Sequence, residues 1–148
     1  MKSDDLKDML ENKNYPELRN ILMSSNSADI SVLLDEFSGE ELIRLYRLLS
    51  KEKAAHVFSY MDPDKQESLI HSMTDKELKN VMDEMADDDA ADMIEEMPAN
   101  LVKRILRHTS PEDRYAINEL LRYPSGSSGS VMTTEFVDLK KNMTVSEA

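Results

Sequence analysis

The chain contains no cysteine and no tryptophan, and only three of its 148 residues are glycine. Without cysteine it can form neither disulfide bonds nor thiolate metal sites, and this absence is typical of a protein in a reducing cytosol. No stretch approaches the roughly 20 apolar residues that a membrane span needs. The N-terminal residues also lack the apolar region of a secretory signal, so we expect this segment to be soluble.

Basic residues are scarce. Asp and Glu number 30 against 18 Lys and Arg, which gives a net charge of −12. Such a charge repels phosphates and argues against a nucleic-acid partner. It suits divalent cations or a basic partner surface, although it can also serve solubility alone. Because aromatics make up only 5% of the residues, the core must consist of Leu, Ile, Val, Ala and an unusual number of Met.

Motifs for catalysis are also missing. The sequence has no phosphate-binding glycine loop, no GxSxG and no HExxH pattern. His56, His71 and His108 have no second His or Cys at ligand spacing, so we expect them on helix surfaces or in last turns. With no nucleophile–base pair to support a reaction, the sequence predicts a binding protein and not an enzyme.

Apolar residues recur every twelve positions through the middle of the chain. The repeating column is Phe37, Leu49, Met61, Met73, Met85 and Met97. The positions that follow it favour helix starts, since most are N-capping residues or proline; they are Ser38, Ser50, Asp62, Thr74, Ala86, Pro98 and Ser110. Seven residues after each start lies another apolar position: Leu45, Val57, Leu69, Val81, Met93, Ile105 and Ile117. The spacing predicts helices of nine or ten residues, with the Met column in the core and not in a partner groove.

One continuous helix does not fit this period. Twelve residues at about 100° each leave the apolar stripe about 120° out of register, and Pro63, Pro98 and Pro111 would interrupt the helix. Short helices that cannot bury their stripes alone must stack, which predicts an all-α solenoid or superhelix. The first third is less regular, and there we predict helices over residues 4–12, 16–23 and 27–37. The last predicted helix covers residues 111–121.

The composition changes after Arg122. We assign residues 1–123 to the helical domain and the Gly/Ser-rich residues 124–130 to a linker. In residues 131–148 we predict a strand at 136–139 and a helix that opens at Thr144, which has Glu147 at capping-box spacing. These pieces are too small for a core, so we expect the protein to continue.

The strongest local feature is a run of acids. Residues 83–97 hold eight carboxylates and no Lys or Arg. On a helix Asp88 and Asp92 project from one face, Asp89 is expected to point away from them, and Asp92 pairs with Glu96. Carboxylates ~6 Å apart repel by ~0.7 to ~3 kcal/mol, and a divalent cation reverses that repulsion. Carboxylate ligands favour Mg²⁺ or Ca²⁺, and Mg²⁺ keeps several waters at such a site. The alternative is a solvated acidic face.

Three stretches resemble the N-terminal cytosolic domain of the MgtE family of magnesium transporters and channels. They are residues 85–98 (MADDDAADMIEEMP), 120–124 (LLRYP) and 129–137 (GSVMTTEFV). The last of them, with Thr144-Val145, is similar to the opening of the family's CBS domain pair. The resemblance covers about residues 30–148, so residues 131–148 are interpreted as the truncated start of the first CBS domain.

The resemblance implies a right-handed superhelix that acts as a cytosolic Mg²⁺ sensor on a membrane-embedded pore. In the family, Mg²⁺ bridges acidic faces of this domain and the CBS domains, and high cytosolic Mg²⁺ closes the pore. The bridging carboxylates match Asp88 and Asp92 here. Beyond that match, we expect Asp89 and Glu96 to contribute more weakly, mainly through the general acidic field. A further family acid is replaced by His56. The implied partners are the chain's own CBS and pore domains in a homodimer, and this fragment is expected to be a monomer. The alternative is a helical interaction scaffold without a metal role, like the short-helix stacks of flagellar rotor switch proteins.

Overall fold

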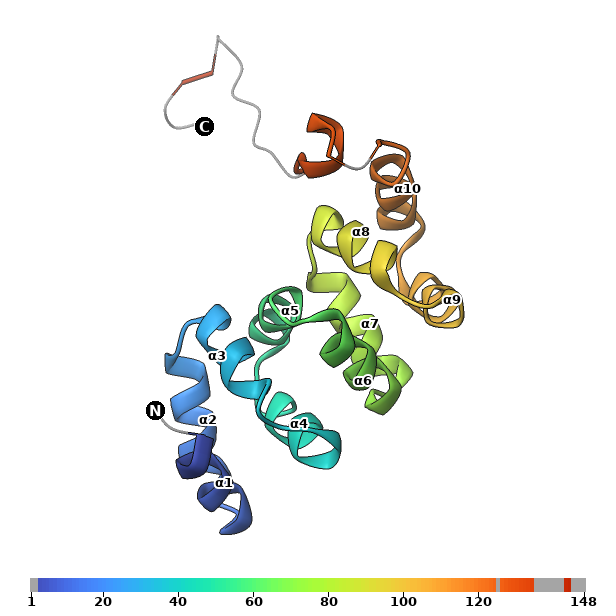
Figure 1. The fold of residues 1–148 in the computed structure, drawn as a ribbon. Helices are drawn as coiled ribbons and strands as arrows, with labels where there is room; N and C mark the ends of the chain where they lie inside the picture. Colours follow the sequence, from blue (N-terminus) through green and yellow to red (C-terminus); the bar gives the residue numbers. More distant parts are fainter. Residues whose placement is uncertain (1–2, 125, 135–142, 145–148) are drawn as a thin grey trace.

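Short helices of eight to ten residues make up the chain in the computed structural model, which describes residues 3–124, 126–134 and 143–144. Within that part there are ten α-helices and no strand (Figure 1). The helices are α1 (Ser3–Glu11), α2 (Tyr15–Ser24), α3 (Ser27–Leu34), α4 (Gly39–Tyr46), α5 (Lys51–Ser59), α6 (Pro63–Ser72), α7 (Asp75–Glu84), α8 (Asp87–Glu96), α9 (Ala99–His108) and α10 (Pro111–Leu120). A 3₁₀ turn, η1, follows at Ser128–Val131. The predicted strand at 136–139 and the helix after Thr144 lie outside the described residues.

The twelve-residue period holds for every one of these helices. Each begins twelve residues after the previous one, from Ser3 in α1 to Pro111 in α10. The prediction of a less regular first third is therefore wrong. In the first third, the column that holds Phe37 and the methionines further along has polar residues instead, Lys13 and Ser25. The period is therefore not visible in that column. The fourth residue of each helix would have revealed it; from α1 to α8 this residue is Leu6, Leu18, Ile30, Leu42, Ala54, Gln66, Leu78 and Ala90, all buried.

Three of the predicted capping side chains hold their helix starts. The Ser50 and Ser110 hydroxyls accept backbone N–H bonds, and Thr74 forms a full capping box with Glu77. Ser38 and Asp62 occupy the capping positions without a side-chain bond. The predicted helix over residues 27–37 ends three residues early, at Leu34. The chain turns there because Phe37 enters the core, where it is 1% exposed.

Helices two apart in sequence pack side by side. Contacts join α3 to α5, α5 to α7 and α7 to α9, and likewise α4 to α6 and α8 to α10 (Figure 1). The predicted core column from Leu45 to Ile117 is buried throughout, as are Met61, Met73, Met85 and Met97. The all-α stack of short helices and the core role of the methionines are confirmed.

Two lysines at the same repeat position form hydrogen bonds to backbone carbonyls that lie 28 residues earlier in the chain. The Lys53 ammonium donates to the Ser25 carbonyl, and the Lys65 ammonium donates to the Phe37 carbonyl at 2.6 Å. Both lysines are the third residue of their helices, α5 and α6. In α7 and α8 the same position holds Glu77 and Asp89, so this repeat position changes there from a basic to an acidic side chain.

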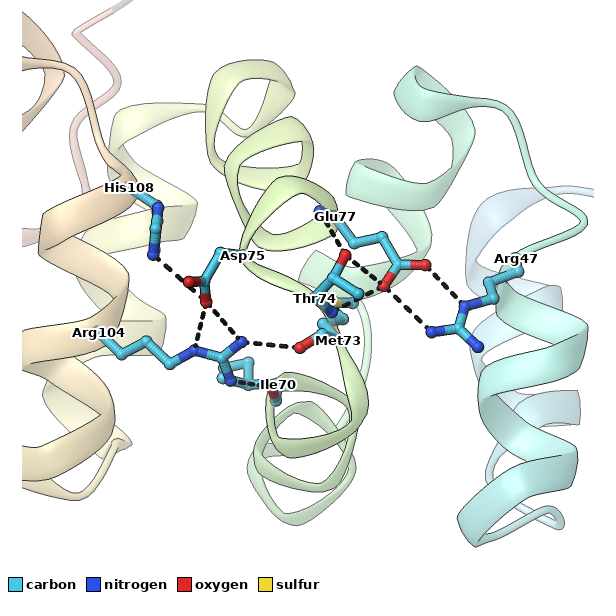
Figure 2. A network of polar contacts seen from close by, with 8 residues as sticks. All are labelled: Arg47, Ile70, Met73, Thr74, Asp75, Glu77, Arg104 and His108. Carbon is cyan, nitrogen blue, oxygen red and sulfur yellow. Dashed lines mark hydrogen bonds and ion pairs between the residues drawn. The ribbon is translucent and has the colours of Figure 1, made fainter.

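The first turn of α7 joins helices on both of its sides (Figure 2). On one side, Arg47 at the end of α4 donates to both Glu77 carboxylate oxygens, at 2.6 and 3.2 Å. On the other, Arg104 of α9 donates to the Ile70 and Met73 carbonyls at 2.6 and 2.7 Å, and to Asp75. The hydrogen bond from Arg47 lowers the pKa of Glu77 from 4.5 to about 2. This pair therefore connects α4 to α7 while Glu77 is ionised.

Replacing Glu77 with glutamine is expected to lower the free energy of unfolding at pH 7 by about 1 kcal/mol, discounted because both side chains reach solvent. Glutamine still suits a capping box, so the change isolates the charge. A lowered pKa adds stability that is fully present above about pH 4.5 and is lost as the pH falls through about 2. Urea unfolding should therefore show the difference shrinking toward pH 2. Glu84→Gln, on the same helix, should change stability by less than about 0.5 kcal/mol. A difference independent of pH would contradict the charge argument.

Candidate functional site

The acid run forms one helix, α8, whose two faces differ in polarity. Ala90, Ala91, Met93 and Ile94 are buried, and α8 packs on α10 and α5. Ala86 caps α8 without a side-chain bond, so the three acids of the first turn compensate the free N–H groups and the helix dipole. We call α8 with its six carboxylates the acid helix. These are Asp87, Asp88, Asp89, Asp92, Glu95 and Glu96.

Three of the predicted site residues line a single hollow. Asp89, Asp92 and Glu96 border a space of about 180 Å³ between the acid helix and α5–α6. The expectation that Asp89 points away from Asp92 is wrong, because residues three apart are neighbours on a helix surface. The other lining residues are Ser59, Met61, Pro63, Gln66 and Met93. Asp88 is not among them, so Asp88 and Asp92 do not share this hollow.

Asp88 carries an unsatisfied oxygen. Its side chain is half-buried, and its Oδ1 is buried with no hydrogen-bond partner among the described residues. Leaving a buried acceptor unpaired costs about 1–3 kcal/mol, and more when the group is charged. A hard cation with its bound waters would satisfy this oxygen, so the donor chemistry fits Mg²⁺. Yet the described residues contain no cluster of three or more Asp, Glu, His or Cys side chains able to hold a metal alone. The acid helix can supply only part of a coordination shell.

The surroundings of Asp89 disfavour its ionised form. Burial raises its pKa most, and the charges of Asp88 and Asp92 raise it further. The Ser59 hydroxyl and His56 oppose that rise. His56 and Asp89 also border a second hollow of about 430 Å³, together with Lys53 and Tyr60. The residue at which this chain departs from the MgtE pattern thus lies beside a predicted site residue.

Sequence patterns alone did not single out Asp87 or Asp113. Burial raises the pKa of Asp87, and the charges of Asp113 and Asp88 add to the rise, while a hydrogen bond from Thr134 opposes it. The Thr134 hydroxyl donates to Asp87 Oδ2 at 3.2 Å. A signal was present, since Asp113 holds the same position in α10 as Asp89 does in α8. The rule that helices two apart are neighbours would have placed it near the acid helix.

Comparisons with known proteins agree with this architecture. The family described as the MgtE intracellular N domain matches residues 25–126. A crystal structure of the cytosolic domain of the Mg²⁺ channel MgtE in complex with ATP matches with a TM-score of 0.85 and 28% identity, over 98% of this chain and 60% of that one. The soluble part of a magnesium transporter matches with a TM-score of 0.78 over 91% of this chain and 54% of that one, and at 24% identity it shows the fold alone. No curated protein matches the chain.

The chain therefore spans less than two thirds of the length of both solved structures. Across the described residues, none of the helices has the length and apolar character needed to cross a bilayer.

Proposed function

Because the chain belongs to the family of MgtE intracellular N domains, we propose that it is the cytosolic Mg²⁺-sensing domain of a magnesium transporter or channel. The observation that carries the proposal is the acid helix. It concentrates six carboxylates on ten residues and leaves one Asp88 oxygen buried and unpaired. A relative of similar fold is the cytosolic domain of a Mg²⁺ channel. The proposed location is the cytoplasmic side of the cell membrane.

The proposed mechanism is a bridge between two acidic surfaces. Asp88 and Asp92 would supply ligands from the acid helix, with Asp89 and Glu96 beside them, and the CBS domains would supply the rest. At high Mg²⁺ the cation replaces carboxylate repulsion with attraction, and the domains close together in the state that closes the pore. At low Mg²⁺ the like charges repel and the helical domain moves away. His56 adds a basic group beside Asp89 and thereby retunes the affinity of this face.

The alternative is a helical scaffold that binds protein partners without metal. Exposed tyrosines such as Tyr60 and Tyr115, which are 62% and 69% exposed, are the kind of side chain that interfaces use. They lie far apart in the sequence, however, one at the end of α5 and one in α10, and do not form a single patch. The two functions differ in one measurable property, which is the response of the acid helix to divalent cations.

A titration of this chain with Mg²⁺, followed by amide NMR shifts, tests the proposal. The shifts should localise to the acid helix and saturate in the millimolar range expected of a few exposed carboxylates. Asp92→Asn should weaken binding about threefold to tenfold, since each 1.4 kcal/mol of lost interaction is tenfold. Glu41→Gln, in the exposed first turn of α4, is the matched control and should bind as the wild type does. Shifts spread evenly over all acidic helices, and equal with Na⁺ at matched ionic strength, would favour the scaffold.

A further inference from the structure

The segment that follows α10 is folded, although its composition is that of a flexible tether. Chains rich in glycine and serine usually behave as random coils. Here the Ser127 amide donates to the Pro124 carbonyl at 3.0 Å, and the Ser130 amide and hydroxyl both donate to the Ser127 carbonyl. The Ser127 hydroxyl in turn caps η1 by accepting from the Ser130 amide. Hydrogen bonds within local turns therefore pair backbone groups that in a flexible linker would bond to water.

Tyr123 fixes one end of this segment. A Cβ built on Gly129 would lie 2.2 Å from Tyr123 Cδ1 and 2.5 Å from Cγ. The Gly129 backbone thus packs directly against the Tyr123 ring, and a side chain at position 129 would clash with that ring unless the ring moved. Tyr123 lies in the turn after α10, where its amide donates to the carbonyl of Leu120, the last residue of that helix, at 3.1 Å. The contact joins the segment to the end of the helical stack.

Asp87 fixes the other end. Thr134 donates its hydroxyl to Asp87 Oδ2 across 47 residues of sequence. Asp87 opens the acid helix and also lies close enough to Asp113 in α10 for their charges to interact. The Thr134 side chain is half-buried in this contact. A carboxylate has about four lone-pair positions, so Asp87 can hold this hydroxyl and a further partner together.

We propose that residues 126–134 form a docked strap, held on α10 through Gly129 and Tyr123 and on the acid helix through Thr134 and Asp87. The strap sets the direction in which the chain leaves the helical domain, and Asp87 is its positioning residue. A change at the start of the acid helix is therefore transmitted to the departing chain by a rigid connection. The proposal concerns the chain without any cation and does not rest on the proposed function.

Replacing Thr134 with valine is expected to release the strap while leaving the helices intact. Valine keeps the shape but removes the donor, whereas Thr134→Ser keeps the hydroxyl and should retain docking. Gly129→Ala should release the other end by displacing the Tyr123 ring. Ser128→Ala, at an exposed position of η1, is the matched control. Amide ¹⁵N relaxation of residues 127–134 measures the effect, and thermal unfolding checks that all variants fold alike.

In the wild type and in the serine and Ser128→Ala variants, these amides should relax like those of the helices. In Thr134→Val and Gly129→Ala they should show the fast motion of a free terminus. Because the chain has no cysteine, spin labels at Lys103→Cys and Met132→Cys give a second readout, a narrow distance distribution that broadens in the released variants. Fast motion already present in the wild type, or equal behaviour of the valine and serine variants, overturns the proposal.

Discussion

Truncating Phe58 to alanine is expected to lower the free energy of unfolding by about 3–5 kcal/mol, the range for a fully buried aromatic side chain. The Phe58 side chain is 0% exposed and contacts Tyr46 edge to face, with ring centroids 6.4 Å apart. Its helix, α5, is central, since it packs on α3, α7 and α8. The cavity would therefore weaken both the stack and the support of the acid helix.

Hydrogen bonds beside Phe58 hold the neighbouring backbone and the Tyr46 ring in place, so the cavity left by the substitution should not close. The Phe58 carbonyl accepts a bond from the buried Gln66 amide at 2.8 Å, and the Tyr46 hydroxyl donates to the Ala54 carbonyl at 2.9 Å. Urea unfolding followed by circular dichroism measures the loss. Tyr60→Ala, two residues along but 62% exposed, should cost less than about 0.5 kcal/mol. Equal losses for the two variants would mean that α5 is not a core helix.

The fold could be predicted from the sequence because its helices repeat with a fixed spacing. A side chain such as Leu69 or Ile105 must be buried wherever a short helix has one apolar stripe, and the twelve-residue spacing shows which side chain that is. The ends of individual helices were harder to predict. Residues 35–37 have helix-compatible side chains, and only the burial of Phe37 against other helices ends α3 at Leu34. Tertiary contacts decided that position, and local propensity did not.

The candidate site could be predicted only in part, because contacts between distant residues also shape it. Spacing along one helix places Asp88 and Asp92 on related faces, but the hollow that collects Asp89, Asp92 and Glu96 is completed by α5 and α6. Asp87 gained its role from Thr134, which follows a segment whose composition indicated only a linker. Contacts between distant parts of the chain assign both features, and no pattern within the acid run contains them.

Neutralising Asp88 and Asp92 together should remove most of the Mg²⁺-dependent closure of the longer protein that we propose carries the CBS domains. Each carboxylate contributes a charge-assisted contact worth about 1.5–3 kcal/mol, so losing one should raise the required Mg²⁺ roughly tenfold or more. In the helical domain alone the same substitutions should relieve repulsion and leave the fold intact. Glu11→Gln and Glu41→Gln, on α1 and α4 and away from the acid helix, form a double control of equal charge change.

Resistance of that longer protein to limited proteolysis, measured as a function of Mg²⁺ concentration, tests bridging by the acid helix most directly. Cleavage between the helical domain and the CBS domains should slow as Mg²⁺ rises in the wild type and in the Glu11→Gln/Glu41→Gln control. In Asp88→Asn/Asp92→Asn, which loses two such contacts, the same protection should require roughly a hundredfold more Mg²⁺ or be absent. Protection that ignores Mg²⁺, or that responds to it identically in all three proteins, would contradict a cation bridge at the acid helix.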